Sequence, residues 1–187
     1  PASDYDSAMY YFSLALPLLT KSDPHKKLPE LLYSMGIASY YRNDTSSSFK
    51  YGLQAINVAR KYNHKLMHWN ALRTFGAINQ QLSKLATAIE YFKEALQIAE
   101  QLNDTEKICI NLNDLGTVYH NLRQDRKAIE YYSKALQQNP PLETKVYLLG
   151  NLGLLFKQNG NYSKAEEYIL LGIKNAQMLS HKENSYN

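Results

Sequence analysis

Apolar residues recur along this chain with the three-four spacing of amphipathic α-helices. In residues 106–122 they form one helical face: Ile108, Leu112, Leu115, Val118, Tyr119 and Leu122. After a polar turn at 123–125 the same spacing restarts and continues to Leu136. No stretch of useful length alternates with the two-residue period of a strand. The pattern therefore predicts an all-α chain built of antiparallel helix pairs.

Three more helix pairs are expected. Their segments are 29–42 with 46–61, 67–82 with 86–102, and 143–158 with 163–179. Thr45 is the predicted N-cap of its helix, and Gly160 suits a helix C-terminus. Pro140 and Pro141 should end the helix before them. Residues 4–19 match only the second helix of a pair.

Small residues return at nearly fixed intervals. Gly36, Gly76, Gly116 and Gly153 are separated by 40, 40 and 37 residues. A second series has the intervals 40, 40, 40 and 37: Ala8, Ser48, Ala88, Ala128 and Ala165. Glycine inside a helix costs about 1 kcal/mol relative to alanine, so its return at one phase indicates that helices cross closely there. Large residues are expected to fill the space between the small ones: Phe12, Phe92, Tyr132 and Ile169. A period of this size predicts stacked repeats.

We expect one continuous array over residues 1–187. It begins with the second helix of a truncated repeat at 4–22 and ends with the start of another truncated repeat at 181–187. The full repeats between them are expected at 28–62, 66–102, 105–139 and 143–180. Both ends thus resemble parts of a longer array.

Composition narrows the function only slightly. The formal charge is +4, and the cations are spread along the chain, so nucleic acid is not an expected direct partner. No stretch approaches about 18 consecutive apolar residues, so no membrane span is predicted. The single Cys109 cannot form an intramolecular disulfide. It fits a reducing compartment, which favours the cytoplasm, with the periplasm as the alternative.

The repeated positions resemble the tetratricopeptide repeat family. One unit matches the family at eight signature places: Leu112, Leu115, Gly116, Tyr119, Ala128, Tyr132, Ala135 and Pro140. The resemblance implies a right-handed α-α superhelix of stacked helix pairs. The 40-residue spacing is longer than the family's usual value of about 34, as in repeats of G-protein regulators, kinesin light chains and bacterial sensory proteins. Ser39, Gly52 and Asn79 depart from the family pattern, so looser packing is expected there, with Tyr51 as a candidate to compensate for Gly52.

The first helices of this family line a concave groove, which implies a binding surface. The implied groove residues are Tyr33, Tyr40, Tyr41, Asn70, Arg73, Gln80, Gln81, Asn113, Thr117, His120, Asn121, Tyr147 and Lys157. The resemblance also implies that Gln158 faces the same side. Amides can pair with an extended peptide backbone, and tyrosines offer rigid contact area. Some relatives clamp a terminal carboxylate, but that clamp is not expected because its positions carry other residues: Tyr33, Ile37, Thr74, Ile110 and Asp114.

No motif predicts catalysis, a cofactor or a metal site. His64 and His68 share a helical face, but no third ligand accompanies them. Cys109 should pack as a small apolar residue, and His120 is a candidate ligand contact in the groove. The tyrosine doublets should pack mainly between helices: Tyr10–Tyr11, Tyr40–Tyr41 and Tyr131–Tyr132.

Three functions stay open. The leading hypothesis is a non-enzymatic adaptor that binds a protein or peptide in the groove. The second is a sensory module of a bacterial transcription regulator or histidine kinase. The third is a scaffold that self-associates through its truncated ends.

Overall fold

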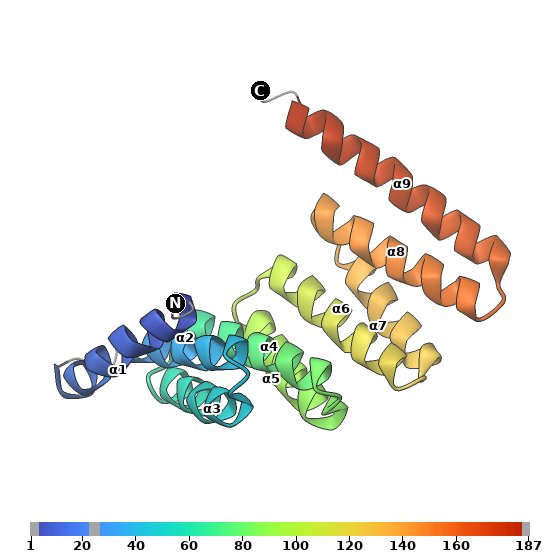
Figure 1. Cartoon of the computed structure of the whole chain (residues 1–187). Coiled ribbons are helices and arrows are strands. Elements are labelled where there is room, and N and C mark those ends of the chain that lie inside the picture. The colour runs from blue at the N-terminus through green and yellow to red at the C-terminus, as the bar shows by residue number, and fades with distance from the viewer. Residues whose placement is uncertain (1–3, 23–26, 185–187) are drawn as a thin grey trace. The chain divides into compact units, whose positions relative to one another are not determined.

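The computed structural model describes residues 4–22 and 27–184, and within them every regular element is an α-helix (Figure 1). The predicted all-α fold is therefore confirmed. The chain forms two compact units, residues 1–79 and 80–187.

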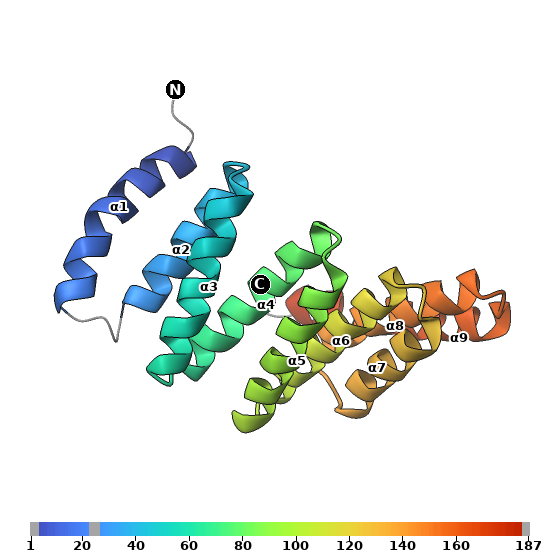
Figure 2. The ribbon, with the colours of Figure 1, turned by 90° about the horizontal axis from the view of Figure 1, so that it is seen from below.

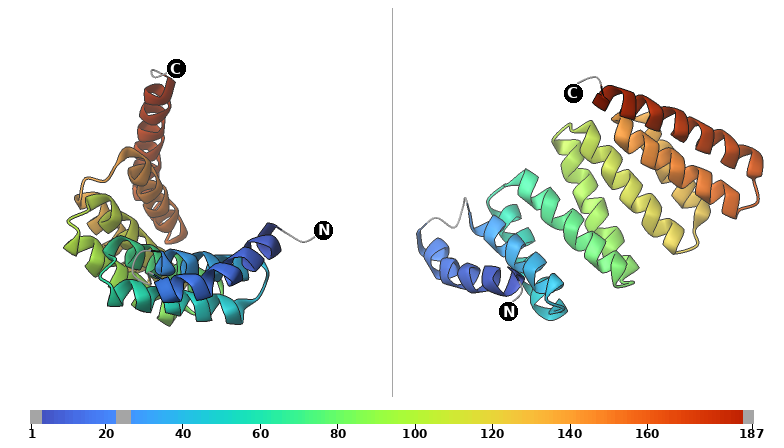
Figure 3. Two further views of the ribbon diagram at one scale, coloured as in Figure 1. Left: turned by 90° about the vertical axis from the view of Figure 1, so that its left-hand side faces the viewer. Right: turned by 45° about the horizontal axis from the view of Figure 1, so that its top comes forward.

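Unit 1 holds three complete helices and most of a fourth: α1 (Asp4–Ser22), α2 (Leu28–Tyr41), α3 (Thr45–Lys61) and α4 (Lys65–Gln81). Unit 2 begins with the end of α4 and holds α5 (Leu85–Gln101), α6 (Thr105–Asn121), α7 (Asp125–Gln137), α8 (Leu142–Gln158) and α9 (Tyr162–Asn184). In unit 1, α2 packs between α1 and α3 (Figure 2). In unit 2, α8 and α9 run side by side in opposite directions (Figure 3).

The sequence period follows from a constant helix length. Helices α3 to α6 each have 17 residues, and a three-residue connection follows each of them. Helices therefore begin every 20 residues, and pairs every 40, between Thr45 and Asp125. The last interval is shorter because α7 has only 13 residues before Pro140 and Pro141.

Each helix connection from α2 to α9 contains one residue in the left-handed backbone region. These residues have φ between 51° and 73°: Asn43, Asn63, Ser83, Asn103, Arg123, Asn139 and Gly160. At five of the turns the next residue donates its N–H to the carbonyl five positions earlier, as Asp44 does to Ser39 at 2.9 Å. This bond closes a Schellman motif and satisfies a carbonyl that the helix leaves unpaired. The expected role of Gly160 at a helix end is confirmed.

The same short turns also start the next helix. Asp44 accepts a hydrogen bond from the Ser47 N–H at 3.0 Å, so it is the N-cap of α3, and the prediction of Thr45 was wrong by one residue. Asp104 caps α6 in the same way, through the N–H of Lys107. The carboxylate is favoured at this place because it pairs with a free N–H and faces the positive end of the helix dipole.

At the C-terminal end, α9 continues to Asn184. Residues 181–184 thus extend the second helix of its pair, and the helix start expected at 181–187 does not fall there. Residues 185–187 lie outside the described part of the chain.

The buried glycines make room for large side chains. A Cβ on Gly116 would lie 2.5 Å from Cε1 of Tyr132, and a Cβ on Gly36 would lie 2.5 Å from Cζ of Phe75. Both distances are far shorter than van der Waals contact, so these crossings exclude any side chain. Ala88 and Ala128 are 0% exposed. The close crossing that the small residues predicted is therefore present.

The core of unit 2 consists of two buried clusters on α5 to α8, which share the partly buried neighbours Ile89, Leu96 and Tyr131. Phe92 packs with Leu115 and Val118, and Tyr132 packs with residues of α6 and α8. Ile169 differs from the expectation because it stays 40% exposed, although it lies against Gly153. No helix follows α9 within the described residues to cover its outer side.

The three departures from the family pattern are well packed, contrary to expectation. The Phe75 ring fills the space beside Gly52, in place of the suggested Tyr51. Asn79 is buried and donates to the carbonyl of Phe75 at 2.7 Å, within its own helix. Ser39 is also buried, and its hydroxyl lies 4.0 Å from the sulfur of Met9.

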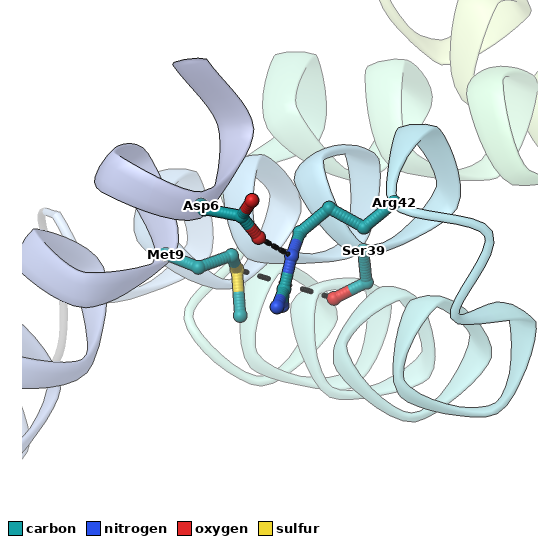
Figure 4. Close-up of polar contacts among 4 residues, drawn as sticks. All are labelled: Asp6, Met9, Ser39 and Arg42. Carbon is teal, nitrogen blue, oxygen red and sulfur yellow. Dashed lines mark hydrogen bonds and ion pairs between the residues drawn. The ribbon is translucent and has the colours of Figure 1, made fainter. Parts of the chain in front are cut away.

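The contacts between α1 and the C-terminal end of α2 include an ion pair and a hydroxyl–sulfur contact. The Arg42 guanidinium pairs with the carboxylate of Asp6. Three residues along each helix, the Ser39 hydroxyl faces the sulfur of Met9 (Figure 4). On the other hand, Tyr10 and Tyr11 are 62% and 67% exposed. The expectation that this doublet packs between helices was therefore wrong.

None of the helices in the described residues has the length and apolar character needed to cross a bilayer.

Candidate functional site

All the predicted groove residues are at least partly exposed, as ligand contacts must be. They divide between the two units. Five lie in unit 1: Tyr33, Tyr40, Tyr41, Asn70 and Arg73. Eight lie in unit 2: Gln80, Gln81, Asn113, Thr117, His120, Asn121, Tyr147 and Lys157.

In unit 1 the aromatic members take part in packing. The Tyr33 hydroxyl shares a 3.0 Å hydrogen bond with Thr74, and its ring meets Phe75 edge-on. Tyr41 stacks on Tyr5 of α1 with ring centroids 4.9 Å apart, yet it stays 58% exposed. These tyrosines hold helices together and leave part of each ring open.

In unit 2 two predicted residues hold neighbouring helices. The Asn113 side-chain oxygen accepts a 2.8 Å hydrogen bond from Asn151 of α8. The Thr117 hydroxyl lies 3.1 Å from the hydroxyl of Tyr132 on α7. Burial raises the pKa of Tyr132, so its hydroxyl keeps the proton needed for that bond.

Three predicted residues come together in a hollow of about 380 Å³ in unit 2. Gln80, His120 and Asn121 line it, together with Gln158. These side chains come from the C-terminal ends of the first helices α4, α6 and α8. Three of the residues that line the hollow are therefore amides, each of which can donate and accept hydrogen bonds.

A carboxylate orients the histidine of this hollow. Nδ1 of His120 lies 3.3 Å from Oδ1 of Asp125, the first residue of α7. A carboxylate oxygen only accepts hydrogen bonds, so the His120 ring donates from Nδ1 in this contact. His120 is thereby held in one orientation at the edge of the hollow.

The sequence reasoning missed three residues of this hollow that lie in turns or at the start of α5. Ser83, Leu85 and Arg123 also line it, but the groove prediction was restricted to first-helix positions. One signal was available, because Arg123 occupies a turn position that elsewhere holds mostly asparagine. Tyr147, at 71% exposure, and the exposed Lys157 do not line this hollow.

The remaining chemical candidates are structural. Cys109 is fully buried, and its thiol lies 3.5 Å from the carbonyl oxygen of Ala135. Burial raises the pKa of this thiol, so the prediction of an apolar packing role is confirmed. His68 is buried and His64 is half-buried. Across residues 4–22 and 27–184, no group of three or more His, Cys, Asp or Glu side chains is arranged to hold a metal ion.

The sequence matches known repeat families. A tetratricopeptide repeat model matches residues 70–139, and a second tetratricopeptide repeat model matches residues 146–177. No curated protein is matched by the sequence of this chain.

Solved structures with the same fold come from several proteins. The crystal structure of BtubC (BKLC) from P. vanneervenii is similar with a TM-score of 0.82 and 19% identity, over 95% of this chain and 75% of that chain. The apo form of RapI has a TM-score of 0.82 and 21% identity, over 98% of this chain and 68% of that chain. A Rap protein complexed with Competence and Sporulation Factor has a TM-score of 0.71 and 21% identity, over 93% of this chain and 49% of that chain.

At sequence identities this low, the structural likeness shows the fold alone. The matches to the repeat models show the family. The helix pairs meet at the glycines and alanines that the repeat pattern requires. The chain therefore belongs to the tetratricopeptide repeat family.

Proposed function

We propose that this chain is a peptide-binding adaptor and that an extended segment of its partner binds in the hollow of unit 2. The observation that carries the proposal is the convergence of three amide side chains in one concave place: Gln80, Asn121 and Gln158. A peptide in extended form has one unpaired N–H and one unpaired C=O at each residue, and amides are the side chains that pair with both.

The size of the hollow fits a local anchor. A volume of about 380 Å³ is at the lower end of the range for small-ligand sites, about 300–1,000 Å³. It therefore accommodates one or two residues of a peptide, with the rest lying along the neighbouring helix ends. His120, fixed by Asp125, adds one oriented hydrogen-bonding group.

The test is a panning experiment in which a library of random short peptides is selected on the purified chain. Selected peptides are then titrated by fluorescence anisotropy against the wild type and against Asn121→Ala with Gln158→Ala. Each lost hydrogen bond contributes about 0.5–1.5 kcal/mol, so the double variant is expected to bind about tenfold more weakly.

Gln97→Ala is the matched control, because Gln97 is an exposed amide on α5 that does not line the hollow. It should leave the affinity unchanged. The proposal fails if the double variant binds the selected peptides as tightly as the wild type does, or if no peptide is selected.

A regulatory module is the second candidate function. The fold shared with RapI and with a Rap protein that binds Competence and Sporulation Factor supports this alternative. A bacterial transcription regulator or histidine kinase would carry its output domain on the same polypeptide. The sequence of the complete gene product tests this alternative, which is rejected if no such domain adjoins the repeats.

Self-association is the third candidate, and a specific surface supports it. Helix α9 exposes a set of large apolar side chains: Leu170, Leu171, Ile173 and Met178. Their contact with another copy would remove apolar area from water. Light scattering over a concentration series tests this candidate, and a mass that stays monomeric throughout contradicts it.

A further inference from the structure

A second hollow adjoins the first at the turn between α6 and α7. It has a volume of about 490 Å³ and is lined by the consecutive residues 123–127 together with Asn159. Arg123 lines both hollows. A single extended ligand can therefore contact both.

The second hollow is strongly cationic. Arg123, Arg126 and Lys127 line it, against one carboxylate, Asp125. That carboxylate already faces His120, with 3.3 Å between Oδ1 and Nδ1. The ammonium of Lys127 lies 5.0 Å from the centroid of the Tyr119 ring, a contact that leaves its charge in place. The local charge therefore stays positive.

Some cations of the chain are neutralised by ion pairs. Arg42 pairs with Asp6, and Lys134 pairs with Glu130. Within the described residues, neither Arg123 nor Arg126 forms an ion pair. Their guanidinium groups are free to meet an anion from outside.

The backbone conformation of Arg123 also supports a contact with an external anion. Its φ is 58°, in the left-handed region, where the chain elsewhere uses asparagine, serine or glycine. An L-residue with a long side chain is disfavoured in that region, and asparagine is tolerated because its short side chain bonds locally. The turn itself gives no reason for arginine, so the reason lies in what its side chain contacts.

We propose that the segment 123–127 binds a carboxylate of the partner peptide, and thus that this adaptor selects acidic segments. This inference rests on the proposed function, because the acidic group is placed by the peptide that occupies the first hollow. Arginine forms paired, charge-assisted hydrogen bonds with a carboxylate, and two arginines with a lysine can surround one such group.

An acidic peptide fits this surface better than a nucleic acid does. The cations form one compact group beside an amide-lined hollow, whereas nucleic-acid sites extend a basic stripe along a backbone of many phosphates. The amides suit a peptide backbone, which places an acidic side chain or a terminal carboxylate within reach of the arginines.

The experiment uses the peptides that the full chain selects from the random library. Each peptide is synthesised in three forms: unmodified, with an amidated C-terminus, and with Asp and Glu replaced by Asn and Gln. Anisotropy titrations compare the wild type with Arg126→Glu, Arg123→Asn and the control Lys174→Glu. Lys174 is an exposed residue of α9 outside both hollows, and its substitution changes the net charge as much as Arg126→Glu does.

We expect the selected peptides to be rich in acidic residues or to require a free C-terminus. The form that lacks the responsible carboxylate should bind about tenfold more weakly, because a charge-assisted pair is lost. Arg126→Glu should weaken the unmodified peptide by at least as much, and Lys174→Glu should not. Arg123→Asn should weaken binding without lowering the thermal midpoint, which separates contact with the peptide from a role in the turn.

Four results would overturn the inference. They are equal affinity for all three peptide forms, equal effects of Arg126→Glu and Lys174→Glu, no effect of Arg123→Asn, and displacement of the peptide by single-stranded DNA at lower concentrations than by excess peptide. If Asn121→Ala with Gln158→Ala still weakens binding in those cases, the proposed function survives alone. If that pair has no effect either, both proposals fail.

Discussion

The glycine at each crossing of two helices sets how closely the helices approach. Gly116 faces the ring of Tyr132, and that ring is 3% exposed and bonded to Thr117. By contrast, a Cβ on Gly150 of α8 would meet nothing within 4 Å. A methyl group added at these two glycines should therefore have opposite effects on stability, although both glycines lie within helices.

We predict that Gly116→Ala lowers the free energy of unfolding by about 1–3 kcal/mol, because the added methyl group overpacks the crossing. Gly150→Ala is the control and should raise it, by up to about 1 kcal/mol, since alanine favours the helix and nothing obstructs its methyl group. Denaturant titrations followed by circular dichroism measure both changes. Equal shifts in one direction would contradict the packing argument.

We also predict that the Cys109 thiol does not react in the native state. It is buried, and burial raises its pKa, so little thiolate forms and reagents cannot reach it. A colorimetric thiol reagent should modify it only as fast as the chain opens, and denaturant should accelerate the reaction strongly. Fast modification of the folded chain would show that α6 is open at this point.

The burial of single residues could be predicted from the sequence where the repeat phase alone decides it. A buried glycine or alanine is indicated by its phase alone, and Gly116 and Ala128 are where that phase places them. The fate of Ser39, Gly52 and Asn79 could not be predicted in this way. Each is accommodated by a residue far away in sequence or by its own helix, as Phe75 does for Gly52.

Among the helices, the three-residue connection repeats more faithfully than any other element. It ends one helix at a left-handed residue, and at Asp44 and Asp104 it starts the next helix with a capping side chain. The sequence predicted the helix spans closely, because their hydrophobic spacing is regular. It misplaced the cap of α3, since both Asp44 and Thr45 are good capping residues and only the backbone decides between them.

We predict that Asp104→Ala destabilises the fold by about 1 kcal/mol, because the N–H of Lys107 loses its acceptor at the start of α6. Asp104→Asn should destabilise it by less, since asparagine is also a good N-cap. Thermal denaturation at neutral pH measures both. A larger loss for asparagine than for alanine would contradict the capping role.

The charge on this cap should make stability depend on pH. Hydrogen bonds from Lys107, through its side chain and then its backbone, hold the pKa of Asp104 below the ordinary value of 3.8. The folded state therefore binds the proton less readily than the unfolded state does. The contribution of this carboxylate is complete above that value and is lost as the pH falls through the lower folded pKa.

The unfolding free energy of the wild type should accordingly fall as the pH drops below the ordinary carboxyl value of 3.8, and less steeply in Asp104→Asn. Asp44 remains as an internal reference, because hydrogen bonds from Ser47 lower its pKa as well. Parallel pH profiles for the wild type and Asp104→Asn would show that Asp104 titrates alike in both states.

Over the whole molecule, stability is distributed among local cores. Unit 2 has its own buried clusters around Tyr132 and Phe92, and unit 1 buries the single tryptophan of the chain, Trp69. In repeat proteins each helix pair is stabilised mainly by its neighbours. The fluorescence of Trp69 therefore reports on unit 1.

We predict that Gly36→Ala lowers the denaturation midpoint followed by Trp69 fluorescence by more than Gly116→Ala does. The reason is that Gly36 lies against Phe75 in unit 1, whereas Gly116 lies in unit 2. Circular dichroism should register both variants. Identical fluorescence shifts would show that the whole chain unfolds as one cooperative body.

The candidate site could be predicted only in part. Gln80, His120 and Asn121 follow from the family's first-helix positions, and the structure brings them into one hollow. Arg123 and Arg126 could not be found in this way, because Arg123 lies in a turn and Arg126 lies in the first turn of α7, outside the first-helix positions. Tyr33 carries the residue type of a ligand contact but bonds to Thr74.

The three-residue connections are too short to absorb a change in the length of a helix. A residue gained or lost inside one of the 17-residue helices would rotate everything beyond it by about 100° and turn its apolar stripe toward water. Insertions and deletions in this protein should therefore be tolerated only at turns or as whole 40-residue blocks. The lengths of natural variants should then reflect the length of the repeat.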